Sequence, residues 1–344
     1  MSVAAARNYE GLRFNQMNLS AEDQIQMYQE REGIPCYSHE KSGGVWRVLS
    51  LDGNSFVSAS YDHKVEVWSY ENGEDHLNLD KLLTTHTREA LSVARLNPET
   101  LISGSSDGSI CFWNLNNYSL EDKIIEKKVN GIYSIGVINP STIVTGSCQR
   151  PQNHKGSWDH VIKIWDIAQK QLIGTLKGHT GGISSIVSLQ DGKFASGSGD
   201  STVRIWDVEQ QASVRMFNVH DDYIYGLTAS TQNCLFTASR DRKIKIIDLR
   251  SEAPVGSLEG PKGDAHESTV YDVKCNSNDV VASCSRDGYV RIWDTRNQQS
   301  ITAMDAQDGY VYSVDFLSNG NVIAGTAGKN PKQKNAHVMA WHYT

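Results

Sequence analysis

The sequence lacks a long apolar stretch and an excess of positive charge, and both absences narrow its class. No run of 18 apolar residues occurs in the 344-residue chain, so we expect no membrane-spanning helix. The formal net charge is −7, from 33 Lys and Arg against 40 Asp and Glu. General nucleic-acid binding needs a basic face that displaces counterions, so it is not expected, although a local basic patch is compatible with this charge.

Cysteine is scarce as well. Six cysteines are scattered through the chain, and none forms a C-x-x-C pair or has zinc-ligand spacing to a histidine. This usage is typical of reduced thiols in a cytosol-like compartment, and it predicts neither a metal nor another cofactor. The opening residues "MSVAAARNYEGLRFNQ" lack the apolar core of a secretory signal. We therefore predict a cytoplasmic protein, with nuclear location or delivery by a specialised secretion machine left open.

What the chain does contain is a repeat. A strand-like phrase ending in an apolar residue and Trp-Asp recurs as "VIKIWD", "STVRIWD" and "GYVRIWD". The anchor positions lie 41 to 52 residues apart, at Trp68, Trp113, Trp165, Trp206, Ile247, Trp293 and Trp341. Seven copies at this period are typical of four-stranded propeller blades. Alternating runs such as "GISSIVSL", punctuated by Gly, Asn, Asp and Ser, predict an all-β chain.

These phrases resemble the WD40-repeat family over about residues 32–344, and the resemblance implies a seven-bladed β-propeller. It also implies a hydrogen-bond network in each blade that joins a His, a Ser or Thr, an Asp and the Trp. Three blades carry all four residues: His86, Ser103, Asp107 and Trp113; His179, Ser196, Asp200 and Trp206; and His266, Ser283, Asp287 and Trp293.

The other four blades depart from this pattern. The first has Lys41 in place of the His, the third has Asn130, and the seventh keeps only its Trp clearly. The fifth has Ile247 in place of the Trp, so its network is expected to end on another partner such as water. A buried network of this kind is interpreted as structural, because an acyl-transfer triad needs an exposed nucleophile. We accordingly predict no enzyme, with a propeller enzyme as the least favoured alternative.

The two ends of the chain are predicted to meet. The last copy stops soon after its Trp, and "IPCYSHEKSGG" at 34–44 matches "LIGTLKGHTGG" at 172–182. Residues 34–39 should therefore supply the outer strand of the last blade, which removes an exposed sheet edge. Residues 1–31 form a predicted extension with a helix at about 21–31, started by Ser20 and Asp23, and residues 32–344 form the propeller domain. The helix is interpreted either as a packing strap or as a partner-binding segment.

Binding side chains are predicted to gather on the face that carries the entry to each first strand and the Asp turn. The position after the first apolar residue of that strand is aromatic in five blades, with Ser92 and Ser184 in the others. Two insertions, at 148–158 and 328–335, fall on the same face. The predicted partner-binding residues are Trp46, Tyr61, Tyr133, Trp158, Tyr223, Tyr225, Arg240, Arg242, Tyr271, Arg286, Tyr310 and Tyr312.

Aromatic residues and Arg are enriched in binding hot spots, so we expect a non-enzymatic scaffold that binds a protein or peptide. It should act as a monomeric propeller within a larger complex. The arginines favour an acidic or phosphorylated segment. The alternative is a methyl-lysine reader of the histone-tail type, in which the aromatic residues form a cage with Asp221, Asp222 or Asp308.

Overall fold

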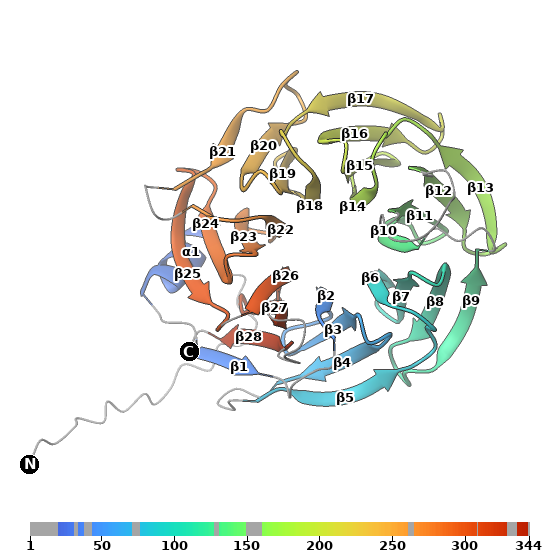
Figure 1. Cartoon of the computed structure of the whole chain (residues 1–344), viewed down its shortest axis with the longest axis horizontal. Helices are drawn as coiled ribbons and strands as arrows, with labels where there is room; N and C mark the ends of the chain where they lie inside the picture. The colour runs from blue at the N-terminus through green and yellow to red at the C-terminus, as the bar shows by residue number, and fades with distance from the viewer. Residues whose placement is uncertain are drawn as a thin grey trace, which may run out of the picture.

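The computed structural model describes residues 20–30, 34–37, 43–70, 76–126, 131–148, 160–260, 265–307, 309–328 and 336–342. Within these ranges the strands form seven four-stranded antiparallel sheets, arranged as blades around a common axis (Figure 1). The prediction of an all-β, seven-bladed propeller is confirmed. No helix in the described ranges has the length and apolar character needed to cross a membrane.

Each blade is numbered here from its innermost strand. Blade 1 contains β2 (Val45–Ser50), β3 (Ser55–Ser60), β4 (Val65–Ser69) and β5 (Asn78–Leu83), and blade 2 contains β6 (Ala90–Asn97), β7 (Thr100–Ser105), β8 (Ser109–Asn114) and β9 (Leu120–Ile125). Blade 3 contains β10 (Ile132–Asn139), β11 (Thr142–Ser147), β12 (Ile162–Asp166) and β13 (Gln171–Leu176), and blade 4 contains β14 (Ile183–Ser188), β15 (Lys193–Ser198), β16 (Thr202–Asp207) and β17 (Ala212–Asn218).

Blade 5 contains β18 (Ile224–Ala229), β19 (Cys234–Ser239), β20 (Ile244–Asp248) and β21 (Gly256–Leu258), and blade 6 contains β22 (Val270–Cys275), β23 (Val280–Ser285), β24 (Tyr289–Asp294) and β25 (Gln299–Asp305). Blade 7 contains β26 (Gly309–Phe316), β27 (Val322–Gly328), β28 (Val338–His342) and β1 (Ile34–Tyr37).

The second strand of each blade is buried because both of its faces pack against neighbouring blades. Its small residues are required by this close approach. A Cβ placed on Gly146 would lie 2.5 Å from the Ile183 Cγ2 of the next blade, and one on Gly325 would lie 2.4 Å from Val45 Cγ1. The Ser-Gly phrases of the repeat are therefore a packing signal, since larger side chains would push adjacent blades apart.

The ring is closed by the two ends of the chain. β1 pairs antiparallel with β28, so that Ile34 lies opposite His342 and Tyr37 lies opposite Met339. The predicted strand at 34–39 is confirmed in its first four residues, and residues 38–42 lie outside the described ranges. Blade 7 thus receives its fourth strand from the start of the sequence, and its outer edge is covered.

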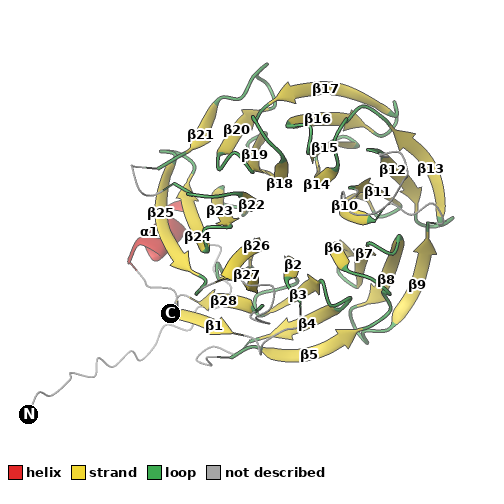
Figure 2. Ribbon diagram, viewed as in Figure 1, coloured by secondary structure: helices red, strands yellow, loops and turns green. Residues whose placement is uncertain are grey.

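The predicted N-terminal helix is also present, as α1 (Ala21–Glu30). Its first turn is capped as expected: the Asp23 amide donates to Ser20 Oγ at 3.2 Å, and the Ser20 amide donates to Asp23 Oδ2 at 3.2 Å. Figure 2 shows the helix beside the outer strands of blade 6. The boundary between an extension at 1–31 and a propeller at 32–344 stays a prediction.

Deleting residues 1–37 should destabilise the propeller far more than deleting residues 1–19. The longer deletion removes both α1 and β1 and leaves the edge of β28 unpaired, and we expect a loss of about 3 kcal/mol or more in the free energy of unfolding. Chemical denaturation of the two truncated chains measures the difference. Equal stability of both truncations would show that β1 adds little to closure.

Candidate partner-binding site

One backbone irregularity recurs at the start of every innermost strand. The pairing with the second strand skips a single residue in all seven blades, as between Val45 and Arg47 or between Val270 and Asp272. A bulge of this kind bends the strand and re-aims the skipped side chain. The skipped residues are Trp46, Leu91, Tyr133, Ser184, Tyr225, Tyr271 and Tyr312.

The second blade therefore corrects one expectation. Ser92 was predicted at the bulge position, but it pairs with Gly104 just as Arg47 pairs with Ala59. Leu91 occupies the bulge instead. The strand begins at Ala90, one residue before Leu91, and a small residue such as Ala is a weak signal for the first apolar position of a strand.

Six aromatic side chains follow one another along this face, and we call them the aromatic arc. Ring centroids lie 4.6 Å apart for Tyr223 and Tyr225, 5.2 Å for Tyr225 and Tyr271, and 4.6 Å for Tyr271 and Tyr312. The series continues over blade 1, with 5.2 Å between Tyr312 and Trp46 and 5.4 Å between Trp46 and Tyr61. These separations are typical of contacting aromatic pairs, so the rings hold one another in place.

The arc borders a cavity of about 710 Å³. The lining residues are Trp46, Arg47, Tyr133, Cys148, His160, Thr180, Gly181, Gly182, Ser184, Gly199, Tyr223, Tyr225, Arg240, Tyr271 and Tyr312. The cavity is asymmetric. Large rings from blades 5, 6, 7 and 1 form one part of the lining, and small residues of blade 4 form another. Blade 3, next to blade 4, adds Tyr133, Cys148 and His160.

Tyr223 is the ring that reaches across blade 4. Its hydroxyl lies 2.9 Å from the Cys148 Sγ of blade 3, so the side chain spans blade 4. The glycines beneath it make this possible, because a Cβ on Gly199 would lie 2.3 Å from the Tyr223 ring and one on Gly182 would lie 2.2 Å from Cys148 Sγ. Burial raises the pKa of Tyr223 and of the Cys148 thiol above their ordinary values, so both are neutral at physiological pH.

The charged groups near the cavity differ in how far they are already paired. Arg47 Nη1 contacts Asp272 Oδ2 at 2.9 Å, and this carboxylate is buried beneath it. Arg240 Nε lies 3.3 Å from Asp222 Oδ2, and both side chains are exposed to solvent, which weakens the pair. Arg286 is exposed, with its guanidinium carbon 5.0 Å from the centre of the Tyr310 ring. Its hydrogen bond to the Tyr310 hydroxyl raises the pKa of this guanidinium.

The predicted partner-binding residues are thus only partly brought together. Seven of them line the cavity: Trp46, Tyr133, Tyr223, Tyr225, Arg240, Tyr271 and Tyr312. Tyr61 belongs to the arc but does not line the cavity, and Tyr310 lies against Arg286. Arg242 is exposed in a turn with φ of 74° and does not line the cavity. Trp158 lies outside the described residues.

Several lining residues were not predicted, namely Arg47, Cys148, His160 and the glycines of blade 4. Arg47 follows the bulge directly, so a register-aware alignment would have found it. The glycines carry no side-chain signal, because their contribution is the space they leave.

The His–Ser–Asp–Trp sets form hydrogen-bond networks beside this face. In blade 4, His179 Nδ1 lies 2.8 Å from Asp200 Oδ2, and His179 Nε2 lies 2.7 Å from Ser196 Oγ. Trp206 Nε1 donates to the same Ser196 Oγ at 2.7 Å, so the hydroxyl proton is directed to the His. Blade 6 repeats these distances within 0.1 Å, in the set His266, Ser283, Asp287 and Trp293.

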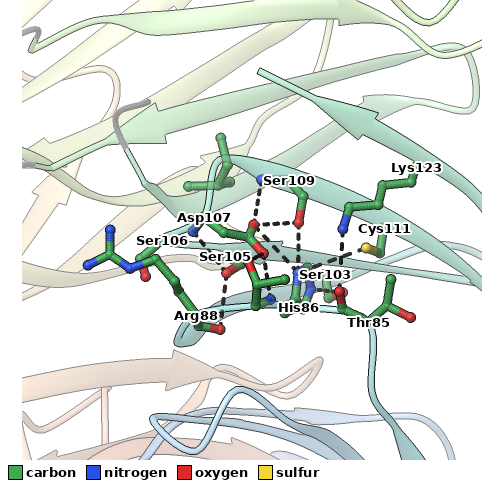
Figure 3. Close-up of polar contacts among 12 residues, drawn as sticks. Thr85, His86, Arg88, Ser103, Ser105, Ser106, Asp107, Ser109, Cys111 and Lys123 are labelled. Atoms are coloured by element: carbon green, nitrogen blue, oxygen red, sulfur yellow. Dashed lines mark hydrogen bonds and ion pairs between the residues drawn. The ribbon is translucent and has the colours of Figure 1, made fainter. Parts of the chain in front are cut away.

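Blade 2 completes the set differently, with a serine between the His and the Asp (Figure 3). His86 Nδ1 lies 2.8 Å from Ser109 Oγ, and Ser109 Oγ donates to Asp107 Oδ1 at 2.5 Å. The direct distance from His86 Nδ1 to Asp107 Oδ1 is 3.9 Å. Ser103 joins the ring to Trp113, at 2.7 Å from His86 Nε2 and 2.8 Å from Trp113 Nε1.

Two incomplete blades compensate with other groups. In blade 5, Thr237 Oγ1 lies 2.7 Å from His220 Nε2 and 3.2 Å from the Lys245 carbonyl oxygen, so a backbone group stands where water was expected. In blade 1, Trp68 Nε1 donates to Ser58 Oγ at 2.9 Å, and Ser58 Oγ donates to Glu66 Oε2 at 3.3 Å. A buried carboxylate therefore accepts the hydroxyl proton that a His accepts elsewhere.

The networks have no exposed nucleophile. Ser103, Ser196 and Ser283 are all fully buried, which leaves no path for a substrate to their hydroxyls. In the described part of the chain, no group of three or more His, Cys, Asp or Glu is placed to hold a metal.

Burial and hydrogen bonding shift the pKa values of these groups. Burial lowers the pKa of His86 to about 4 and also lowers the pKa of His266. Burial alone would raise the pKa of Asp241 and Asp287, but hydrogen bonds from their histidines outweigh it and lower each pKa to about 2.

Comparison with known protein families identifies the family of this chain. The profile for "WD domain, G-beta repeat" matches residues 33–69, 79–114, 170–207, 211–248 and 254–294, which together exceed half of the chain. The chain belongs to the WD40-repeat family. The residues of β10–β12, in blade 3, and of β26–β28, in blade 7, are not matched. These blades carry the two insertions and the most degenerate motif.

Similar proteins share the repeat rather than a full-length relationship. A 145-residue segment is 26% identical to pre-mRNA-processing factor 19 homolog 2 of Arabidopsis thaliana and covers 42% of this chain and 26% of that protein. A 148-residue segment is 32% identical to the nuclear distribution protein PAC1 of Arthroderma benhamiae and covers 41% of this chain and 30% of that protein. The matched segment therefore spans less than a third of either relative.

Solved structures agree on the fold. The WD40 propeller domain of Doa1 superposes with a TM-score of 0.74 at 24% identity, covering 91% of this chain and 98% of that one. The WD40 repeats of RRP9 give 0.75 at 17% identity, covering 90% and 97%. At these identities the likeness concerns the fold alone.

Replacing the central hydroxyl should cost more in blade 4 than in blade 5. Ser196→Ala leaves both the Trp206 indole N–H and His179 Nε2 without a partner. Thr237→Val removes the partner of His220 Nε2 and a 3.2 Å bond to the Lys245 carbonyl oxygen, but it leaves no indole N–H unpaired. We expect losses of about 3 kcal/mol and about 1.5 kcal/mol in the free energy of unfolding, respectively. Urea denaturation of both variants measures this order, and the reverse order would contradict the assignment of the indole bond.

Stability should fall in two steps as the pH is lowered. The pKa of His86 is about 4 in the folded chain and about 6.5 in the unfolded chain, so the unfolded chain binds the proton first. The free energy of unfolding therefore decreases as the pH falls from about 6.5 to 4. Asp241 and Asp287, with folded pKa values of about 2, remove stability as the pH falls from about 4 towards 2.

Urea denaturation at a series of pH values checks this dependence. His86→Asn should flatten the slope of stability against pH in the upper window. Ile110→Val, which alters the same blade without a titrating group, should lower stability but keep the slope. A wild-type slope in His86→Asn would show that His86 is not the group responsible.

Proposed function

We propose that this WD40 propeller is a non-enzymatic scaffold that binds a protein or peptide partner in the cavity bordered by the aromatic arc. The observation that supports this most is the continuity of the arc over blades 5, 6, 7 and 1 around one cavity. Aromatic side chains give large contact areas at small entropy cost, which is why they are enriched at binding hot spots. The proposal includes a monomeric propeller working within a larger complex in the cytoplasm.

The partner segment is proposed to be acidic or phosphorylated. Among the described residues that line the cavity there is no carboxylate, whereas Arg47 and Arg240 are present. Arg47 is neutralised by Asp272, but the exposed pair of Arg240 and Asp222 can open to accept an anion. Arg286 stands one blade further along with its guanidinium exposed, so two cations on neighbouring blades face an incoming segment.

The same charges weigh against a methyl-lysine cage. Such a cage needs a carboxylate close to the rings that stabilises the cation. Neither Asp221 nor Asp222 lines the cavity. Asp308 lies outside the described residues.

Substitutions on the arc and on Arg286 should separate these proposals. Peptides selected on the full-length protein from a displayed library supply ligands, and fluorescence polarisation measures their Kd. We expect Tyr225→Ala to weaken binding by about tenfold or more, because it removes a central ring. Arg286→Glu should weaken acidic or phosphorylated peptides by a similar factor through charge reversal.

Two exposed residues away from the cavity provide matched controls. Leu172→Ala on β13 and Arg250→Glu after β20 should leave the Kd unchanged. Selected peptides that bind Tyr225→Ala as tightly as wild type would refute the cavity as the site. Ligands enriched in methylated lysine and unaffected by Arg286→Glu would favour the reader instead.

A further inference from the structure

Blade 7 lacks the His and hydroxyl residues of the hydrogen-bond network found in other blades. Ala324 stands in place of the network hydroxyl and Gln307 in place of the His. Its outer strand, β1, belongs to the opposite end of the chain. Contacts from neighbouring elements add to the pairing and packing within this blade.

On one side, α1 packs into the core shared by blades 6 and 7. Ile25 and Tyr28 are buried in one cluster with residues of both blades, including Met304, Phe316 and Trp341. The helix thus contributes to the hydrophobic core of the ring from outside the sheets.

Polar contacts fix the same helix to the turns of both blades. Tyr28 Oη donates to the Gly320 carbonyl oxygen at 2.5 Å, in the turn between β26 and β27. Asn276 Nδ2, after β22, donates to Gln24 Oε1 at 2.7 Å. The bond from Tyr28 is buried and the bond to Gln24 is partly buried, so both add to the free energy that holds the helix in place.

On the other side, the same turn of blade 7 is held by blade 1. Asn319 Nδ2 and Asn321 Nδ2 both donate to Tyr70 Oη, and Tyr70 Oη donates to the Gly53 carbonyl oxygen at 3.2 Å. Nearer the axis, the Ser50 amide donates to Asp315 Oδ2 at 3.0 Å. The turn at 317–321 is therefore clamped between α1 and blade 1.

We propose that α1 is a latch on the closing seam, defined as blade 7 with its contacts to α1 and blade 1. While α1 is docked, β1 and β28 stay paired and blade 7 stays in the ring. Undocking of α1 opens the seam locally and leaves blades 2, 3 and 4 folded. Only residues 31–33 separate α1 from β1 in the sequence.

This latch goes beyond the proposed binding function and does not depend on it. The latch would be a regulatory device. Any factor that binds α1 in competition with the propeller would increase exposure of the β28 edge, and an exposed strand edge pairs with another strand.

Hydrogen exchange of the full-length protein, followed by mass spectrometry, tests the latch. Tyr28→Ala should speed exchange of amides in β27, β28 and β1 by about tenfold, because local opening becomes easier. Amides of blades 2, 3 and 4 should stay within about twofold of wild type. Tyr28→Phe keeps the ring and loses one hydrogen bond, so it should give a smaller increase at the same places.

Tyr118→Ala is the matched control, since it removes a partly buried Tyr that packs against the core shared by blades 1 and 2. It should not accelerate exchange at the seam selectively. Equal acceleration in all blades of Tyr28→Ala, or none at the seam in either Tyr28 variant, would overturn the latch.

Discussion

Closure of the ring is the constraint on which the rest of this structure depends. Each sheet has two apolar faces, and both are buried only when every blade has a neighbour on each side. A single blade lost from the circle would expose the faces of two others. The pairing of β1 with β28 meets this requirement by bringing together segments from the two ends of the sequence.

The repeated motif explains the propeller fold, and the residues that differ between repeats explain the candidate site. All seven innermost strands begin with the same bulge, so the backbone presents seven equivalent positions. Six of these residues line the cavity, where the side chain is free to vary, whereas Leu91 in blade 2 is buried. Five blades place an aromatic ring there, and the chemistry of the face follows from that choice rather than from the fold.

Much of the fold could be predicted from the sequence because its signals are local and repeated. The Trp anchors, the Asp turns and the small residues of the second strands recur in register, and one end of the chain matched an outer strand found elsewhere. The site was less predictable. The sequence pattern selects Ser92 where the structure has Leu91, because Ala90 is a weak signal for the start of a strand. Arg47 is missed because it follows a bulge that the pattern does not mark. The water expected beneath Ile247 proved to be the Lys245 carbonyl oxygen, a backbone group that no sequence pattern marks. The contacts of Gly182 and Gly199 depend on three adjacent blades, so only coordinates reveal them.

The small-residue lining of blade 4 has a consequence for how anything can sit on this face. Seven similar blades give the molecule a near rotational symmetry. Under that symmetry alone, a binding partner could dock in seven equivalent orientations. Unequal side chains around the cavity abolish that equivalence, because blades 1, 3, 5, 6 and 7 contribute large rings and blade 4 contributes glycines that Tyr223 and Cys148 cover. A chain bound here would meet a different surface at each blade, so its seven placements would differ in free energy. The asymmetry would therefore give a bound segment a preferred direction about the propeller axis.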